Sequence, residues 1–124
     1  MNFSKKYHLT KEDVKWVLVD FDGTIHPYDP KDKRYQIKNP PIEGAKETLK
    51  EIEKLGYKIV IYTARPWSEY KPVEEYLLHY RIPFRRIICG KVFASIIIDD
   101  KAFRLNNWKR DKKKIIEILT KEKN

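Results

Sequence analysis

The sequence predicts an α/β fold with a mainly parallel sheet, and three observations support this. Short apolar runs alternate along the chain with longer segments whose apolar residues recur at helical spacing. The apolar runs are nearly continuous, as is typical of buried parallel strands. Polar residues directly follow several of these runs. We therefore expect a three-layer α/β/α sandwich with right-handed crossovers, whose polar strand ends share one edge of the sheet.

Apolar runs predict four strands, over residues 16–20, 57–63, 86–89 and 94–98. Helical spacing predicts a helix between Ile42 and Leu55, ended by Gly56. A second helix begins at Ser68 or Pro72 and ends at Ile82-Pro83.

A C-terminal helix is expected between Trp108 and Leu119, whose apolar residues line one side. Near the other end, Thr10 begins the run Thr-Lys-Glu-Asp, which resembles a helix start and favours a short helix there.

Length and composition bound the class of protein. The 124 residues predict one domain over 1–124, with a polar extension over 1–15 and a surface loop over 21–41. Hydrophobic residues make up 41% and charged residues 36%, and no apolar run approaches the ~18 residues of a membrane span. Residues 1–15 lack the apolar centre of a signal peptide. The single cysteine, Cys89, is expected to be buried, and a reducing cytoplasm fits it best.

Acidic and hydroxyl side chains stand at three of the predicted strand ends. Asp20 and Asp22 follow the first strand, Thr63 ends the second, and Asp99 and Asp100 follow the fourth. Carboxyl ends of parallel strands are where ligands bind in open α/β sheets. Several carboxylates at one edge form a hard-oxygen site, which suits Mg²⁺ better than zinc.

A phosphate substrate fits the remaining residues of this edge. Thr63 can donate a hydrogen bond to a phosphoryl oxygen, as can backbone N–H groups between Phe21 and Gly23. Lys91 lies in the loop before the fourth strand and can neutralise phosphate charge. Phosphoryl transfer depends mainly on positioning and charge compensation, which these groups supply. The formal net charge of +9 also favours anionic partners.

In chain order, these residues resemble the four motifs of the haloacid dehalogenase (HAD) superfamily: Asp20-Phe21-Asp22-Gly23-Thr24-Ile25, then Thr63, Lys91 and Asp99-Asp100. The resemblance runs from about residue 16 to about 105. The small capless, phosphatase-like members of the superfamily are similar in two further segments, Ile61-Tyr62-Thr63-Ala64-Arg65 and Ile98-Asp99-Asp100-Lys101-Ala102. The resemblance implies a HAD-like Rossmannoid fold with no cap domain.

The resemblance also implies roles for individual residues. Asp20 would be the nucleophile that forms an aspartyl-phosphate, and Asp22 the general acid and base. Thr63 and Lys91 would hold the phosphoryl oxygens. The metal, Mg²⁺, would bind the Asp20 side chain, the Asp22 main-chain carbonyl and Asp99. The remaining acid, Asp100, would bind it directly, through water, or only orient its neighbours.

Two related chemistries fit less well. Haloacid dehalogenases lack the second acid of the first motif, which this chain keeps as Asp22. Response-regulator receiver domains place their acidic pair first and the phosphorylated acid in mid-chain, whereas here the order is reversed.

Four residues beside the motifs are candidates for substrate binding: Gly23, His26, Ala64 and Arg65. His26 is either a substrate contact or an ordinary loop residue. Arg65 either binds a second anionic group or pairs with a nearby acid. Nearby Tyr28 and Trp67 are placed to stack on a base or sugar ring, although Trp67 could equally cover the start of a helix.

The absence of a cap leaves the expected site open. Either a large substrate, such as a nucleic-acid end or a phosphoprotein, covers it, or a second copy in a homo-oligomer does. The basic run from Lys109 to Lys114 is interpreted as a solvated helix face in preference to a nucleic-acid contact. The expected function is a Mg²⁺-dependent phosphomonoester hydrolase. A nucleic-acid end phosphatase and a non-catalytic phosphate-binding or partner-binding module are the alternatives.

Overall fold

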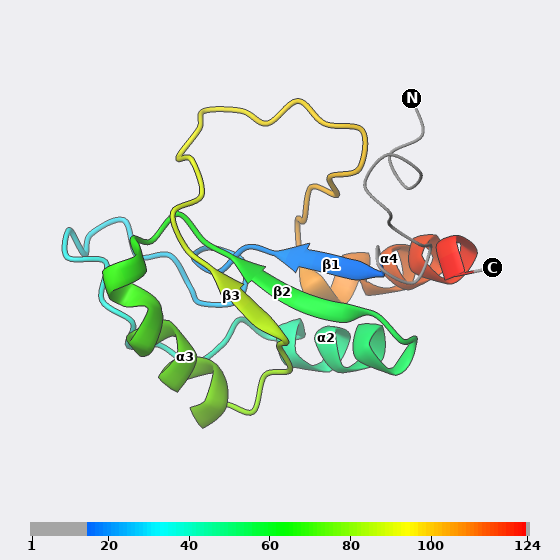
Figure 1. The fold of residues 1–124 in the computed structure, drawn as a ribbon, viewed down its shortest axis with the longest axis horizontal. Helices are drawn as coiled ribbons and strands as arrows, with labels where there is room; N and C mark the ends of the chain where they lie inside the picture. The colour runs from blue at the N-terminus through cyan, green and yellow to red at the C-terminus, as the bar shows by residue number, and fades with distance from the viewer. Residues whose placement is uncertain (1–14, 124) are drawn as a thin grey trace, which may run out of the picture.

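The computed structural model describes residues 15–123 and shows an α/β fold built on a three-stranded parallel sheet. The strands lie in the order β1 (Trp16–Val19), β2 (Lys58–Tyr62), β3 (Arg86–Ile88), and both pairings are parallel (Figure 1). The mainly parallel sheet expected from the sequence is therefore confirmed for these strands.

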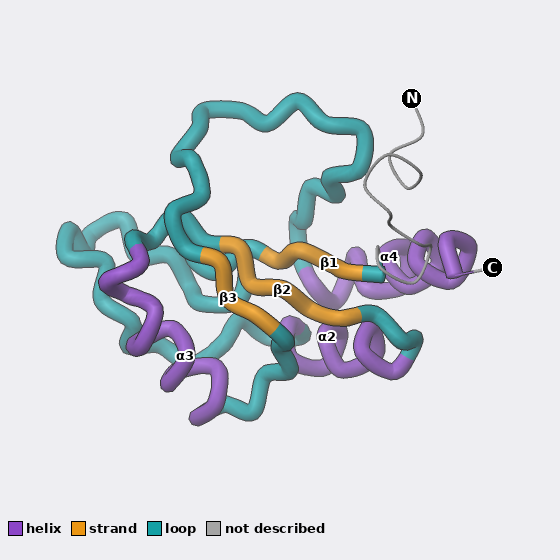
Figure 2. The backbone as a smooth tube through the Cα atoms, in the orientation of Figure 1, coloured by secondary structure: helices purple, strands orange, loops and turns teal. Residues whose placement is uncertain are grey.

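Helices connect and follow the strands, as the apolar spacing predicted. Along the chain, the helix α2 (Ala45–Lys54) connects β1 to β2, and α3 (Tyr70–His79) connects β2 to β3 (Figure 2). A short 3₁₀ turn, η2 (Trp67–Glu69), leads into α3. The chain ends in α4 (Trp108–Lys123), which packs against α2.

The core forms between one face of the sheet and the helices. Inward side chains of the strands, including Val19, Ile61 and Ile87, join a single buried cluster with residues of all three helices. Trp16 and Leu18 project from the other side of β1 and are exposed. Within residues 15–123, the helices thus line one face of the sheet, whereas the sequence predicted layers on both.

The predicted strand over residues 94–98 is wrong. The whole segment from Gly90 to Asn107 contains no helix or strand, and its apolar residues are exposed except Leu105, which is partly buried against the core. In Figure 1 it arches away from the sheet on the side of β1. β-branched residues favour a strand only when a neighbouring strand pairs with them, and here none does. Among residues 15–123, β1 therefore pairs with β2 alone.

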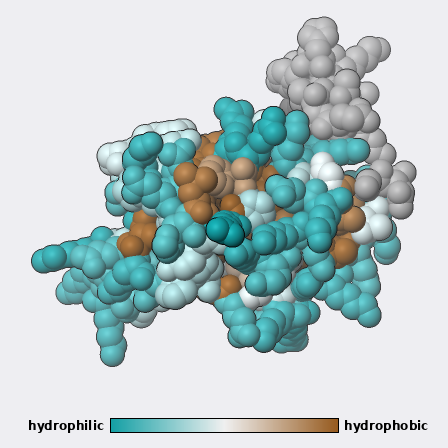
Figure 3. Space-filling view, turned by 90° about the horizontal axis from the view of Figure 1, so that it is seen from below, coloured by the Kyte–Doolittle hydropathy of each residue, from teal (hydrophilic) through white to brown (hydrophobic). Residues whose placement is uncertain are grey.

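Other expectations have mixed outcomes. Cys89 is free and buried, as expected. The possible helix from Thr10 and most of the polar extension over 1–15 lie outside the described residues. None of the helices described between residues 15 and 123 has the length and apolar character needed to cross a membrane. The face of the molecule seen from below is mostly hydrophilic, with only separate apolar areas (Figure 3).

Candidate active site

Asp20 and Lys91 meet at the carboxyl end of β1. Asp20 is the first residue after the strand, and its Oδ1 lies 3.9 Å from Nζ of Lys91. Burial raises the pKa of the Asp20 carboxyl, which Lys91 and the hydrogen bonds from Phe21 N–H and Thr24 only partly oppose. The sequence had placed both residues at this edge, and the structure brings them together.

A tight turn follows Asp20 and fixes the direction of Asp22. The Phe21 carbonyl accepts hydrogen bonds from the N–H groups of Thr24, Ile25 and His26 at 3.2, 2.8 and 3.0 Å. Gly23 adopts φ +79°, a conformation that a side chain disfavours. Its N–H donates to the His26 carbonyl at 2.7 Å. In this structure that N–H is therefore used inside the turn and is not free for a phosphate.

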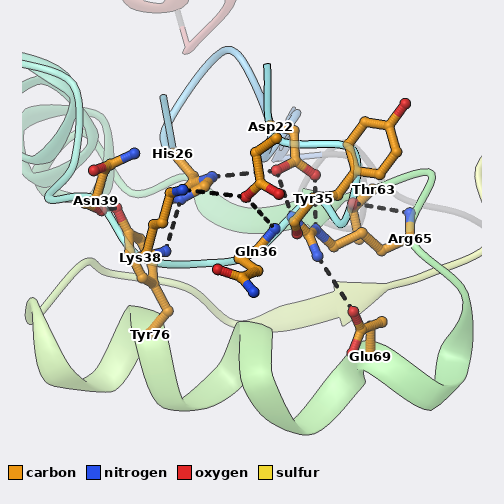
Figure 4. A network of polar contacts seen from close by, with 11 residues as sticks. Asp22, His26, Tyr35, Gln36, Lys38, Asn39, Thr63, Arg65, Glu69 and Tyr76 are labelled. Carbon is orange, nitrogen blue, oxygen red and sulfur yellow. Dashed lines mark hydrogen bonds and ion pairs between the residues drawn. The ribbon is translucent and has the colours of Figure 1, made fainter. Parts of the chain in front are cut away.

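Arg65 holds the carboxylate of Asp22 (Figure 4). Its Nε lies 2.8 Å from Oδ2 and its Nη2 lies 2.9 Å from Oδ1, which is a two-point contact. Nη2 also donates to the Tyr35 carbonyl at 2.7 Å, and Nη1 to Glu69 at 3.3 Å. The guanidinium is buried and committed to these partners. Of the two interpretations the sequence left open, the structure shows the pairing with an acid, and contact of Arg65 with a substrate stays a prediction.

His26 contacts the same carboxylate. Its Nδ1 lies 3.3 Å from Asp22 Oδ1, while its Nε2 accepts the Lys38 N–H at 3.2 Å (Figure 4). Accepting at Nε2 leaves the proton on Nδ1 in the neutral ring, which then donates to Asp22. Burial lowers the pKa of His26, with the Asp22 contacts opposing the shift. The ring stacks on Phe21 and is buried, so in this structure His26 positions Asp22, and its contact with a substrate stays a prediction.

Thr63 and Ala64 follow β2 at the same edge of the sheet. The Thr63 N–H donates to the Ile88 carbonyl, and its own carbonyl accepts from the Lys91 N–H at 3.0 Å, which ties the Lys91 loop to this strand end. Its hydroxyl accepts the Arg65 N–H at 3.2 Å and is buried. Ala64 is exposed beside it. The end of β2 thus lies where the sequence predicted. The Thr63 hydroxyl points into the turn that leads to Arg65.

Asp99 and Asp100 are not brought to this site. Both are exposed on the segment that arches away from the sheet, and Asp99 Oδ1 accepts the Lys101 N–H at 2.6 Å. Among the described residues, no group of three or more His, Cys, Asp or Glu side chains is placed to hold a metal. The expected four-acid metal site is therefore not assembled in this conformation, because the strand that would carry two of the acids is not paired.

Several residues of the network were not identified from the sequence, among them Tyr35, Glu69 and Tyr76. Tyr35 contributes its main-chain carbonyl to Arg65 and has φ +52°, and Glu69 contributes its carboxylate. Tyr76 donates from its hydroxyl to the Asn39 carbonyl at 2.8 Å and packs edge-on against the His26 ring. The i, i+4 spacing of Arg65 and Glu69 was the one available signal. Nothing local marks Tyr35, since its role depends on how the 21–41 loop folds back.

The basic run of α4 is partly neutralised. Lys109 pairs with Glu43, and Lys112 Nζ lies 3.1 Å from Glu51 Oε1 of α2. These contacts agree with the interpretation of this run as a solvated helix face.

Comparisons with known proteins give a fold relationship without a function. No family model matches the chain, and no curated protein matches it. A crystal structure of an MCSG target from Vibrio cholerae is similar, with a TM-score of 0.64 and 27% sequence identity. The similarity covers 88% of this chain and 99% of that one.

Proposed function

We propose that this protein is a Mg²⁺-dependent phosphomonoester hydrolase with a HAD-like fold, acting through an aspartyl-phosphate. The observation that carries the proposal is the placement of Asp20 beside Lys91, with Asp22 held rigidly two residues further on. A half-exposed carboxylate beside an ammonium group is suited to attack an anionic phosphorus centre. The ordered likeness of the motifs to that superfamily supports the same function.

Each side chain of the site has a distinct task in this reaction. A carboxylate oxygen of Asp20 forms the new bond to phosphorus, while the bond from phosphorus to the leaving oxygen breaks. Lys91 offsets the negative charge of the phosphoryl oxygens. Asp22 gives a proton to the leaving oxygen, and later takes one from the water that hydrolyses the aspartyl-phosphate, once one of its oxygens is released from Arg65 or His26. Until then Arg65 and His26 keep the Asp22 carboxylate in one orientation beside Asp20.

The donors at this edge suit a hard cation. Mg²⁺ is commonly bound by one or two protein carboxylates together with water and substrate phosphate. The Asp20 carboxylate and the Asp22 main-chain carbonyl would hold it, since both Asp22 side-chain oxygens are occupied by Arg65 and His26. Bound there, it would supply further charge neutralisation on the phosphoryl group.

The test is turnover of a panel of phosphomonoesters by the purified chain in Mg²⁺ and in EDTA. We expect hydrolysis in Mg²⁺ alone, and a fall of roughly 10³-fold or more in Asp20→Asn, because the nucleophile is lost. Asp29→Asn is the matched control, since that carboxylate lies in the same loop region but contacts Lys31 and Lys38 instead of the site. Equal rates for Asp20→Asn and Asp29→Asn would overturn the assignment.

Acid-quenched reactions with labelled substrate extend this test. Label retained on the wild-type chain and absent from Asp20→Asn identifies the aspartyl-phosphate. A stable phosphorylated protein without turnover would instead favour the third function, a non-catalytic phosphate-binding module.

A second candidate, a nucleic-acid end phosphatase, is favoured by the aromatic rings around the site. Tyr28 and Tyr35 are exposed, with ring centroids 6.3 Å apart, and the Tyr35 main chain contacts Arg65. Bases stack on such rings with little sequence preference. Oligonucleotides phosphorylated at either end should then be better substrates than glycerol phosphate, and Tyr35→Leu should lose this preference while Tyr35→Phe keeps it. Equal rates on both substrate classes would exclude this candidate.

A further inference from the structure

The backbone around Lys91 is held against the turn that follows β2. The Gly90 N–H donates to the Arg65 carbonyl at 2.8 Å, and the Lys91 N–H donates to the Thr63 carbonyl at 3.0 Å. Gly90 has φ +80°, and a Cβ added there would lie 3.4 Å from Nε1 of Trp67. The main chain at Lys91 is therefore fixed, and its flexible side chain alone is left to be oriented.

The ion pair with Asp20 attracts this side chain without fixing it. The distance of 3.9 Å between Lys91 Nζ and Asp20 Oδ1 is longer than a charge-assisted hydrogen bond, which is about 2.7–2.9 Å. Lysine side chains populate many rotamers, and ordering one on ligand binding costs free energy. A second contact that orders the Lys91 side chain beforehand would lower this cost.

The ring of Tyr62 supplies that second contact. Lys91 Nζ lies 5.3 Å from the ring centroid, which is within the range of about 6 Å for a cation–π interaction. Val19 of β1 pairs with Ile61 of β2, and the next residue on each strand follows the same register, which places Tyr62 beside Asp20. Because Ile61 points into the core, Tyr62 points to the opposite face of the sheet. The Lys91 ammonium thus meets the ring and the Asp20 carboxylate together.

An aromatic ring differs from a carboxylate as a partner for this lysine. The face of the ring attracts the ammonium group, but the ring carries no net charge. The contact therefore leaves the positive charge of Lys91 and its N–H donors available to an anion. A second carboxylate in the place of Tyr62 would hold the ammonium group too, but it would repel an anionic ligand. Tyr62 is thus suited to orient Lys91 without weakening its attraction for phosphate.

We propose that Tyr62 is a positioning residue, whose ring holds the Lys91 ammonium group where it meets the phosphoryl group of a substrate. This role rests on the proposed function, since that function assigns Lys91 to the phosphoryl oxygens. The face of the ring produces the effect, and the hydroxyl of Tyr62 contributes nothing to it. Loss of the ring should therefore weaken the binding of inorganic phosphate, the product of the proposed reaction, whereas loss of the hydroxyl should leave it unchanged.

Titration with inorganic phosphate in Mg²⁺, followed by NMR, tests this role. Tyr62→Leu should raise the Kd about 2- to 5-fold, and Tyr62→Phe should keep the wild-type value because the ring remains. Tyr80→Leu is the matched control and should not change the Kd, since that ring is also partly buried but packs on Tyr76. In a Lys91→Met background, Tyr62→Leu should have no further effect, because the interacting pair is already broken.

The same spectra report the contact in the absence of any ligand. The ring current of Tyr62 should shift the methylene protons next to Lys91 Nζ upfield, and their signals are identified by their loss in Lys91→Met. The upfield shift should persist in Tyr62→Phe and disappear in Tyr62→Leu. Unshifted protons in the wild-type chain would overturn the proposal, whatever the phosphate titrations show.

The titrations separate failure of this role from failure of the proposed function. Equal Kd values for the wild type and Tyr62→Leu overturn the positioning role alone, because phosphate still binds. A Tyr62→Phe variant as weak as Tyr62→Leu overturns it as well, since the hydroxyl is then the group that matters. If the wild-type chain shows the upfield shift but binds no phosphate, the proposed function has failed, and the assignment of Lys91 to phosphate fails with it.

Discussion

Arg65 and Asp22 are 43 residues apart in the chain and form a two-point contact, with Nε 2.8 Å from Oδ2 and Nη2 2.9 Å from Oδ1. The arginine comes from the turn after β2 and the aspartate from the turn after β1. The pair therefore ties together the carboxyl ends of two strands. It also fixes the Asp22 carboxylate that the proposed reaction uses as acid and base.

Replacing the arginine should show how much this contact stabilises the fold. Arg65→Lys keeps the charge but cannot make two parallel hydrogen bonds to one carboxylate. We expect the free energy of unfolding to fall by about 2 kcal/mol, below the full cost of breaking a buried pair because Asp22 is partly exposed. Urea denaturation measures the change.

Glu69→Gln is the control for that experiment, since it weakens only the 3.3 Å contact to the same guanidinium. Its effect should stay below about 1 kcal/mol, as for most exposed ion pairs. A loss in Glu69→Gln that matches the loss in Arg65→Lys would show that the Asp22 contact carries little of the stability.

Stability should decline at mildly acidic pH because of His26. Its pKa is lowered in the folded protein, chiefly by burial. As the pH falls through the ordinary value of about 6.5, the unfolded chain gains a proton that the folded ring resists. The free energy of unfolding should therefore decrease with falling pH until the folded His26 also becomes protonated. Urea midpoints between pH 8 and pH 5 record this slope.

Two glutamine variants assign that slope to its residue. His26→Gln should be less stable at neutral pH and should lose most of the pH dependence in this range. His79→Gln, at an exposed position on α3, should keep it. A slope that persists in His26→Gln would mean that another group is responsible.

Asp20 should be a residue that lowers stability in the absence of a cation. Burial raises the pKa of its carboxyl in the folded state, so its ionised form is disfavoured there at neutral pH. Asp20→Asn should raise Tm in EDTA even though it abolishes turnover. The gain should shrink as the pH falls toward about 4, where the wild-type carboxyl is protonated.

Glu117→Gln, on the exposed side of α4, is the control and should leave Tm nearly unchanged. A lower Tm in Asp20→Asn than in the wild type would contradict the expected cost of burying this charge.

Gly44 should be intolerant of any side chain, for a reason that depends on α4. A Cβ on Gly44 would lie 2.9 Å from Cβ of Trp108, and its φ is +89°. Gly56 has a similar φ of +98° but has nothing within 4 Å of the added atom. Gly56→Ala therefore measures the backbone cost alone, about 1 kcal/mol. Gly44→Ala should cost about 1–3 kcal/mol more because α2 and α4 must move apart, and equal losses in thermal unfolding would show that the two helices adjust freely.

Local patterns determined most of the secondary structure. The spacing of Leu49 and Ile52 predicts α2, and the apolar run through Ile59 and Ile61 predicts β2, because each pattern reflects burial against a core within a few residues of chain. The position of Asp20 at a strand end follows from the same reasoning. The sequence also predicted Lys91 at that edge, because it lies in the loop after β3. The observed contact between Lys91 and Asp20 agrees with this prediction.

Tertiary structure alone decided how the polar groups of the site pair. Whether Arg65 faces a substrate or an acid depends on the turns after two different strands, and His26 turns inward because Phe21 and Tyr76 pack on its ring. Whether residues 94–98 form a strand also depends on tertiary structure. Their composition favours a strand, but a strand exists only when its backbone groups are paired, and no described strand pairs with these residues.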